Sequence, residues 1–154
     1  ETTSSILGEH LDADLKGKTV LDMGCGTSIL AILASMRGAK AVTAIDIDDW
    51  CVNNSRDNIA LNHIDNITAE LGDASLLKGR EPFDVIIANI NRNILLNDMH
   101  AYVECMHPGS ELYMSGFYVD DIPAIREKAE SLGLTFDHYR EKNRWVAVKF
   151  IAAE

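Results

Sequence analysis

Short apolar runs and amphipathic stretches alternate along most of the chain. The runs are β-branched or continuously apolar, which is typical of strands buried on both faces. The stretches between them carry apolar residues at spacings of three and four, the period of a helix that lies on a sheet. The runs that predict strands are TVLDMG (19–24), AVTAID (41–46), ITAEL (67–71), FDVIIAN (83–89) and ELYMSGF (111–117).

Three helical stretches stand out between these strands. Residues 28–36 are apolar almost all round, which predicts a helix covered on several sides. Two more stretches have one apolar stripe each: Leu95, Met99, Tyr102 and Met106 in the first, and Ile122, Ile125, Ala129 and Leu132 in the second. Strands that alternate with such helices predict a doubly wound, mostly parallel sheet, in which ligands bind at the carboxyl ends of the strands.

The pattern changes after Gly133. The segments LTFDHYR (134–140) and RWVAVKFI (144–151) both alternate between apolar and polar residues, with EKN (141–143) between them. This alternation predicts a C-terminal antiparallel hairpin. No repeat, low-complexity segment or linker interrupts the sequence. We therefore expect a single α/β domain over residues 1–154.

Composition narrows the class of protein. The chain has 154 residues, 47% of them hydrophobic, which is enough for one core without disulfides or a metal. No run approaches the ~20 apolar residues of a membrane span, so we expect no membrane contact. Three scattered cysteines without a CxxC pair favour a reducing, cytoplasmic compartment and argue against a structural zinc site. A net charge of -10 disfavours general binding to nucleic acid and is compatible with a basic partner.

Two glycines, Gly24 and Gly26, stand between the first predicted strand and the first predicted helix. Glycine lets the backbone bend sharply and lets a ligand approach where a Cβ would collide. The unpaired amides at the helix start attract an anionic group, and Thr27 or Ser28 is a suitable cap. A dinucleotide fingerprint would need glycine or alanine at Ile29, and a P-loop would need a lysine that is absent.

Polar residues end successive predicted strands. Asp46 ends the second strand, a position where a carboxylate accepts hydrogen bonds from two ribose hydroxyls. Asp73 follows the third strand and Asn89 ends the fourth. Each residue alone also has an ordinary explanation: Asp46 as a solvated strand end, and Asp73 and Asn89 as turn residues, which for Asp73 alone is the better explanation. Together they predict one crevice for a nucleoside without a pyrophosphate, and S-adenosylmethionine is such a ligand.

At these residues the sequence resembles the class I S-adenosylmethionine-dependent methyltransferases. It resembles most closely the PrmA family, the methyltransferases of large-subunit ribosomal protein L-eleven. The segments that carry the resemblance are ETTSSILGEHL (1–11), GKTVLDMGCGTSILAILASMRGAKAVTAIDID (17–48), ANINRNIL (88–95), YMSGF (113–117) and RWVAVKF (144–150). Ser28 and Ser110 replace glycines that are usual in the family, and Asn91 replaces a usual leucine.

The resemblance implies a Rossmann-like methyltransferase fold with S-adenosylmethionine as cofactor and no metal. The implied cofactor-binding residues are Thr3, Gly24, Gly26, Asp46, Ile47, Asp73 and Asn89. Ile47 would lie against the adenine, and Asp73 near its amine. Asn89 would also be catalytic, because its oxygen can accept a hydrogen bond from the acceptor amine and direct the lone pair of that amine. The histidines lie outside the strand-end motifs, and no general base is evident.

The activity implied is methyl transfer to lysine or N-terminal amines of a ribosomal protein, by a monomer that contacts neither nucleic acid nor membrane. The chain starts at Glu1 without a methionine. We therefore expect a fragment, and the resemblance implies that it lacks the small N-terminal substrate-recognition domain of the family.

Other functions fit parts of the same pattern. A methyltransferase of a small molecule or of a nucleic-acid base would use the same cofactor site, although the chain has no basic patch interleaved with aromatic residues. A nicotinamide-dependent oxidoreductase is disfavoured by Ile29. A module that binds the cofactor without turnover stays open. Phe117, Tyr118 and Trp145 either flank the acceptor or pack in the core, and we favour the core.

Overall fold

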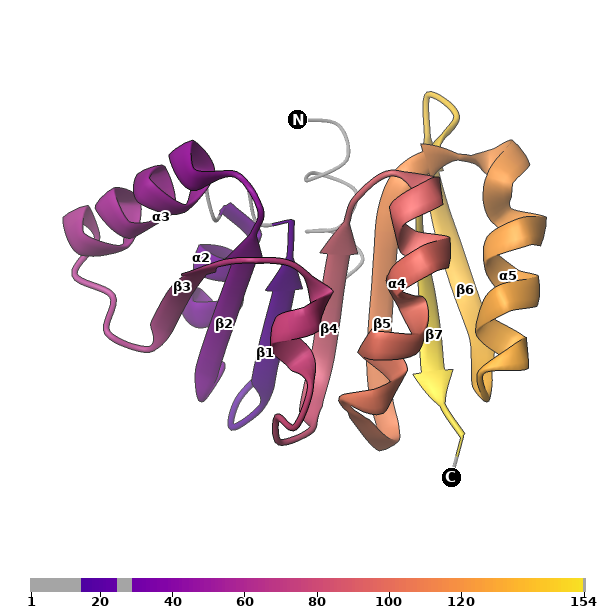
Figure 1. Cartoon of the computed structure of the whole chain (residues 1–154), viewed down its shortest axis with the longest axis horizontal. Coiled ribbons are helices and arrows are strands. Elements are labelled where there is room, and N and C mark those ends of the chain that lie inside the picture. Colours follow the sequence, from indigo (N-terminus) through magenta and orange to yellow (C-terminus); the bar gives the residue numbers. More distant parts are fainter. Residues whose placement is uncertain (1–14, 25–28, 154) are drawn as a thin grey trace.

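A computed structural model describes residues 15–24 and 29–153. The strands in this part of the chain are β1 (Thr19–Met23), β2 (Ala41–Asp46), β3 (Ile67–Leu71), β4 (Phe83–Asn89), β5 (Met106–Tyr118), β6 (Leu134–Lys142) and β7 (Trp145–Ala152). The helices are α2 (Ile29–Met36), α3 (Asp49–Leu61), α4 (Arg92–Glu104) and α5 (Ile122–Ser131), with short 3₁₀ turns η1 (Ala74–Leu77) and η2 (Val119–Asp121) (Figure 1).

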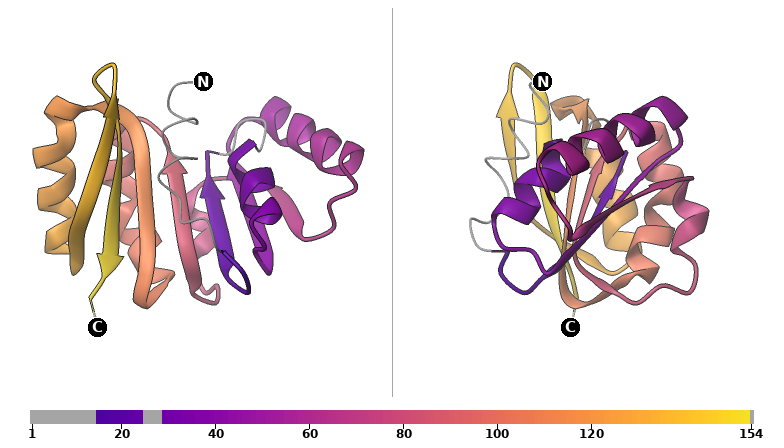
Figure 2. Two further views of the ribbon diagram at one scale, coloured as in Figure 1. Left: turned by 180° about the vertical axis from the view of Figure 1, so that it is seen from behind. Right: turned by 90° about the vertical axis from the view of Figure 1, so that its left-hand side faces the viewer.

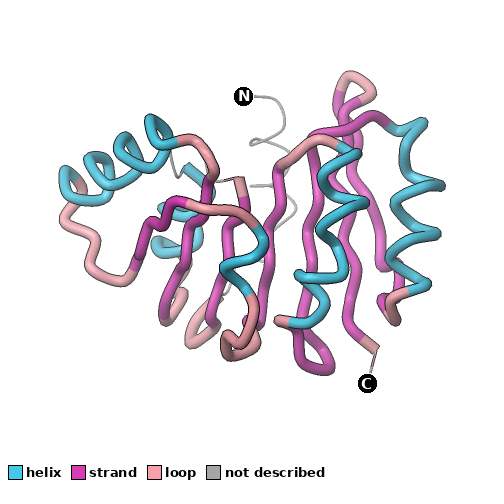
Figure 3. The backbone as a smooth tube through the Cα atoms, viewed as in Figure 1, coloured by secondary structure: helices cyan, strands magenta, loops and turns pink. Residues whose placement is uncertain are grey.

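The strands form one sheet in the order β3-β2-β1-β4-β5-β7-β6. The first five in this order are parallel, and β7 runs antiparallel to both β5 and β6. The strand order reverses between β1 and β4, which is where doubly wound sheets bind ligands. The loops after β2 and β4 lie at the same edge of the sheet (Figure 3). The predicted fold class is confirmed.

Helices cover both faces of the sheet, and each face has its own core. On one face α4 and α5 bury Leu95, Met99 and Ile125 against the strands. On the other, α2 and α3 bury Ala31 and Val52. Figure 2 shows α2 in front of the sheet and α4 behind it. Within the described residues no helix is long and apolar enough to cross a membrane.

Two details of the predicted elements are wrong. Met106 was assigned to a helical stripe, but α4 ends at Glu104 and Met106 begins β5. It is still partly buried against the same core, so apolar spacing alone does not reveal the change of backbone. The hairpin turn lies at Asn143 and Arg144 rather than at EKN, because both residues adopt positive φ (53° and 71°), as a two-residue turn between twisted strands requires.

At the amino ends of the strands, Asp84 joins three of them. Its Oδ2 accepts hydrogen bonds from the Thr19 amide (2.9 Å) and the Thr19 hydroxyl (3.3 Å). Nε2 of His107 donates to Asp84 Oδ1 at 2.6 Å, and Nδ1 donates to the Pro108 carbonyl at 2.8 Å. Because both partners are acceptors, the imidazole holds two protons and a positive charge.

The pKa values of this pair shift in opposite directions. The hydrogen bond to Asp84, followed by the one to Pro108, raises the pKa of His107. Burial raises the pKa of Asp84, but the hydrogen bonds from His107 and Thr19 outweigh burial and lower it. The pair therefore stabilises the junction of β1, β4 and β5 while His107 is protonated.

We predict that His107→Gln destabilises the fold more at pH 6 than at pH 9. A raised pKa means that the stabilisation is complete below the ordinary histidine pKa of about 6.5 and is lost as the pH rises through the folded-state value. Urea unfolding of both proteins at the two pH values measures the difference. His100→Gln, at an exposed helix position, is the control. An equal loss at both pH values would contradict the charged pair.

Candidate functional site

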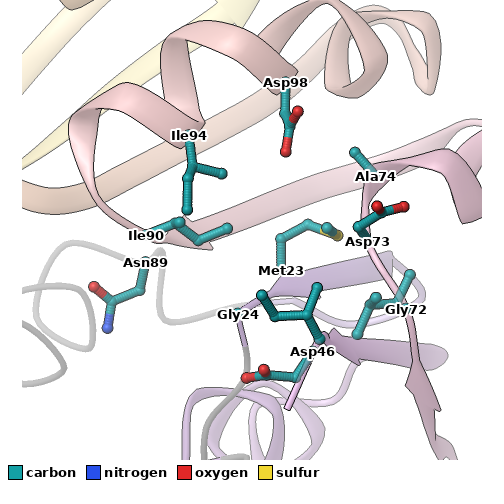
Figure 4. Close-up of a pocket in the computed structure, with 12 residues that line it drawn as sticks. Met23, Gly24, Asp46, Gly72, Asp73, Ala74, Asn89, Ile90, Ile94 and Asp98 are labelled. Atoms are coloured by element: carbon teal, nitrogen blue, oxygen red, sulfur yellow. The ribbon is translucent and has the colours of Figure 1, made fainter.

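A cavity of about 210 Å³ opens at the carboxyl ends of β1 to β4. Five of the predicted cofactor residues line it: Gly24, Asp46, Ile47, Asp73 and Asn89. Thr3 and Gly26 lie outside the described residues. In Figure 4, Asn89, Gly24, Asp46 and Asp73 follow one another across the cavity in the order of strands β4, β1, β2 and β3. The structure therefore brings together the strand ends that the sequence pattern connects.

Asp46 and Asp48 have different roles at the end of β2. Asp48 is the N-cap of α3, where its Oδ1 accepts a hydrogen bond from the Trp50 amide at 2.9 Å. Asp46 lines the cavity, and its Oδ1 accepts a hydrogen bond from the Asp48 amide at 2.9 Å, which fixes the turn. Between them Ile47 is 71% exposed on the cavity rim. The exposed side chain of Ile47 offers an apolar surface against which a flat ring can pack.

Asp73 stabilises a turn as well as lining the cavity. Its Oδ1 accepts hydrogen bonds from the Ser75 amide (2.9 Å) and the Ser75 hydroxyl (2.6 Å), and so caps η1. These bonds, the hydroxyl first, lower the pKa of Asp73. The carboxylate therefore stays ionised beside the cavity. The turn role of Asp73 is confirmed, and its contact with a cofactor stays a prediction.

Two glycines hold the backbone of Asn89 and Ile90 from opposite sides. A Cβ on Gly24 would stand 2.8 Å from Ile90 Cγ1 and 3.2 Å from the Asn89 carbonyl oxygen. A Cβ on Gly116 would stand 2.5 Å from the Ile90 carbonyl oxygen. Both glycines have positive φ, and the Ile90 amide donates to the Ser115 carbonyl at 3.1 Å. Any other residue at 116 would displace the segment that carries Asn89.

Asp22, the acid in the middle of β1, is a buried carboxyl group for which the sequence pattern predicts no role. Its carboxyl group is 1% exposed, and neither oxygen has a hydrogen-bond partner among the described residues. Burial, and then the negative charge of Asp46, raise its pKa to about 7, against a smaller opposing effect of the Ala31 amide. A carboxyl group inside an apolar strand costs free energy when it ionises. The sequence already places Asp22 inside an apolar run that predicts a strand, so this cost can be expected from the sequence.

The prediction of core packing holds for only part of the aromatic group. Phe117 is buried at 2% exposure, as predicted. Tyr118 is 45% exposed, and its prediction is wrong, because it is the last residue of β5. It stacks on Trp145, with the ring centres 4.3 Å apart. Within the described residues, no group of histidine, cysteine and acidic side chains could hold a metal ion.

Comparison with known sequences agrees with the family resemblance seen in the sequence motifs. A family model described as "Ribosomal protein L11 methyltransferase (PrmA)" matches residues 1–152. The ribosomal protein L11 methyltransferase of Phocaeicola vulgatus is 80% identical over 98% of the chain and 54% of its own length. That of Streptococcus pneumoniae is 39% identical over 87% of the chain and 42% of its own length. The chain thus spans about half the length of these curated relatives.

Solved structures extend the comparison to the fold. The ribosomal protein L11 methylase of Lactobacillus delbrueckii subsp. bulgaricus superposes with a TM-score of 0.87 at 30% identity, over 98% of the chain and 78% of that protein. The magnesium protoporphyrin IX methyltransferase of Synechocystis, solved with bound SAM, has a TM-score of 0.79 at 17% identity, over 97% of the chain and 78% of that protein. At 17% identity, the similarity to the Synechocystis protein shows only that the two proteins share a fold.

We predict that Asp22→Asn removes part of the pH dependence of stability. A folded pKa of about 7, above the ordinary value of 3.8, means that stability falls as the pH rises from about 4 to 7. Between pH 5 and pH 8 the variant should gain about 3 kcal/mol relative to the unmutated chain. Urea unfolding at both pH values measures this gain. Asp65→Asn, at an exposed loop position, should show none. A gain that is the same at both pH values would contradict the raised pKa.

Proposed function

The chain belongs to the ribosomal protein L11 methyltransferase (PrmA) family, and on that premise we propose that it binds S-adenosylmethionine and methylates amines of ribosomal protein L11. The observation that carries this proposal is the cavity at the carboxyl ends of β1 to β4, which Gly24, Asp46 and Asn89 line together. The acceptor amines are lysine side chains, the N-terminus, or both.

The charges of the cavity suit this cofactor. Asp46, Asp73 and Asp98 line it, and none of the described lining residues is a lysine or an arginine. A cavity lined by carboxylates attracts a cationic sulfonium and an ammonium group, and repels the phosphates of a dinucleotide. The acidic lining therefore favours S-adenosylmethionine over NAD, in agreement with Ile29 in the loop.

The size of the cavity fits the nucleoside part of the cofactor. Pockets for whole drug-sized ligands measure about 300–1,000 Å³, whereas this cavity measures about 210 Å³. We assign the ribose to Asp46, a face of the adenine to Ile47 and the adenine amine to Asp73. Thr3 and Gly26 complete the proposed set.

Asn89 is the proposed catalytic residue. Bound S-adenosylmethionine supplies a methyl group on a positively charged sulfur. The acceptor nitrogen must arrive without its extra proton, which for a lysine at pH 7 costs roughly 4–5 kcal/mol. Alignment of the reacting atoms can lower the barrier by about 7–11 kcal/mol, so positioning is the larger effect. The side-chain oxygen of Asn89 can accept a hydrogen bond from the amine and direct its lone pair at the methyl group.

Proton removal requires no dedicated side chain in this scheme. No histidine is among the described residues that line the cavity. The apolar side chains of Ile90 and Ile94 stand beside Asn89 (Figure 4). Their apolar surface disfavours a charged ammonium next to Asn89 and so opposes the attraction of the carboxylates for that charge. Water then takes the proton.

We further propose that the enzyme is a cytoplasmic monomer that binds neither nucleic acid nor membranes itself. The net charge of -10 supports attraction to a basic ribosomal protein and repulsion from phosphates. We also propose that the part of the relatives beyond this chain contributes a separate substrate-recognition domain.

We predict that the chain binds S-adenosylhomocysteine and that Asp46→Asn weakens this binding about 10- to 100-fold. The variant replaces the charged carboxylate by a neutral amide. Hydrogen bonds from the ribose hydroxyls to a charged group contribute about 1.5–3 kcal/mol. Isothermal titration calorimetry measures both affinities. Asp65→Asn should bind as the unmutated chain does, and NADH should not bind. A chain that binds NADH instead would reject the proposed cofactor.

We predict that Asn89→Ala lowers kcat for methylation of ribosomal protein L11 about 100-fold, because misplacement of an attacking group costs a factor of that order. S-adenosylhomocysteine affinity should fall by at most about tenfold, since Asn89 is only one of several cofactor contacts. Transfer of radiolabelled methyl groups measures kcat. Asn53→Ala, at an exposed position of α3, is the control. An unchanged kcat in the Asn89 variant would contradict the assigned role.

A further inference from the structure

Asp22 is a buried acid that the proposed function leaves unused. Its side chain is 1% exposed, and neither carboxyl oxygen has a hydrogen-bond partner among the described residues. Native proteins contain few such groups, because a buried polar atom without a partner costs free energy that an apolar residue would not. A carboxyl group of this kind in the middle of β1 therefore needs an explanation of its own.

The surroundings of Asp22 disfavour its ionised form. On the sheet it lies between Ala44 of β2 and Ile87 of β4, which are both buried. The helix α2 packs on the same face and has no charged side chain, although its Ala31 amide slightly favours the ion. Among the described residues, the charge that acts on Asp22 is the negative one of Asp46. Burial, followed by this charge, raises the pKa of Asp22 to about 7, so both of its forms are populated near neutral pH.

Asp22 lies behind the proposed cofactor site without being part of its wall. Gly24 lines the cavity (Figure 4) and stands two residues further along the chain, a separation that spans at most about 7 Å. Asp46 lines the same cavity. A charge held against Gly24 is therefore on the order of 10 Å from Asp22. Protein rather than solvent surrounds the carboxyl group, so salt screens such an interaction only weakly.

The proposed cofactor and its product differ in charge at one atom. The sulfur of S-adenosylmethionine is a cation, whereas the sulfur of S-adenosylhomocysteine is neutral. A unit positive charge on the order of 10 Å away lowers the pKa of a carboxyl group by about one unit at an effective dielectric constant of about 20. A neutral sulfur has no such effect. The charge of the ligand therefore acts on a group that can respond by losing or gaining a proton.

We propose that Asp22 responds to the charge of the bound cofactor and thereby favours S-adenosylmethionine over S-adenosylhomocysteine. When the cation binds, the carboxyl O–H bond breaks, the electron pair stays on the oxygen, and the proton leaves to water. The carboxylate then attracts the sulfonium. Once the sulfur is neutral, the carboxylate takes a proton back from water and that attraction ends. This inference rests on the proposed methyltransferase function and adds a means of distinguishing the cofactor from its product.

Calorimetric titration with both ligands tests this role. We compare the affinity for S-adenosylmethionine with that for S-adenosylhomocysteine, as a ratio, in the unmutated chain and in Asp22→Asn, which keeps the shape but cannot ionise. From about pH 5.5 to about pH 8 the ratio should rise about 3- to 10-fold more in the unmutated chain, because the cation binds best to ionised Asp22. Both chains meet the same ligands, so titration of the ligands themselves cancels. Asp65→Asn, at an exposed loop position, should behave as the unmutated chain does.

Infrared difference spectroscopy observes the proton itself. At about pH 6.5, below the folded-state pKa, Asp22 is mostly protonated in the free chain. The C=O band of a protonated carboxyl group should lose most of its intensity when S-adenosylmethionine binds and keep it when S-adenosylhomocysteine binds. Asp22→Asn should lack this band with either ligand.

The same pH dependence of the affinity ratio in the unmutated chain and in Asp22→Asn would overturn the inference. So would a carboxyl band that responds equally to the two ligands. The second result needs only the unmutated chain, so it decides the matter even if thermal unfolding shows that Asp22→Asn does not fold. A chain that binds neither ligand rejects the proposed function and this inference with it, whereas binding of both ligands without the pH effect rejects the inference alone.

Discussion

The close contact of the Asn89–Ile90 segment with two glycines is the constraint on which the cavity at the carboxyl edge of the sheet depends. Parallel strands place their carboxyl ends at one edge of the sheet, and the distances between the ends of β1, β4 and β5 depend on how closely the residues there pack. Here the Asn89–Ile90 segment lies so close to Gly24 and Gly116 that neither glycine has room for a Cβ. The same contact places Asn89 and Ile90 in the wall of the cavity. A small loss of closeness would displace both residues.

Negative charge is the second organising feature of this edge. Asp46 and Asp73 each use a carboxylate oxygen to fix a turn, so the acids build the edge as well as lining it. Asp22 lies behind them in the strand, and the charge of Asp46 helps to keep it protonated. A bound cation would reverse that balance, because a positive charge near these groups favours their ionised forms. Ligand charge and protein ionisation are therefore coupled at this edge.

Much of the fold follows from the sequence, because strands buried on both faces appear as continuous apolar runs. The run at 83–89 has the bounds of β4. The misses have a common physical cause, which is that hydrophobic spacing records burial but not backbone direction or neighbours. Met106 is buried and still not helical. Gly116 matters because of Ile90, a residue on another strand, and the exposure of Tyr118 depends on where β5 ends.

The place of β7 in the sheet has a consequence for how the chain is made. The last strand of the described residues, β7, lies between β5 and β6, and not at the edge. While residues 145–152 are still inside the ribosomal tunnel, β5 and β6 have no partner between them and Tyr118 has no ring to stack on. The half of the sheet built from β1 to β4 can pair as soon as it emerges. The cavity at the carboxyl ends of β1 to β4 can therefore form before residues 145–152 are available, whereas the stack of Tyr118 on Trp145 forms only afterwards.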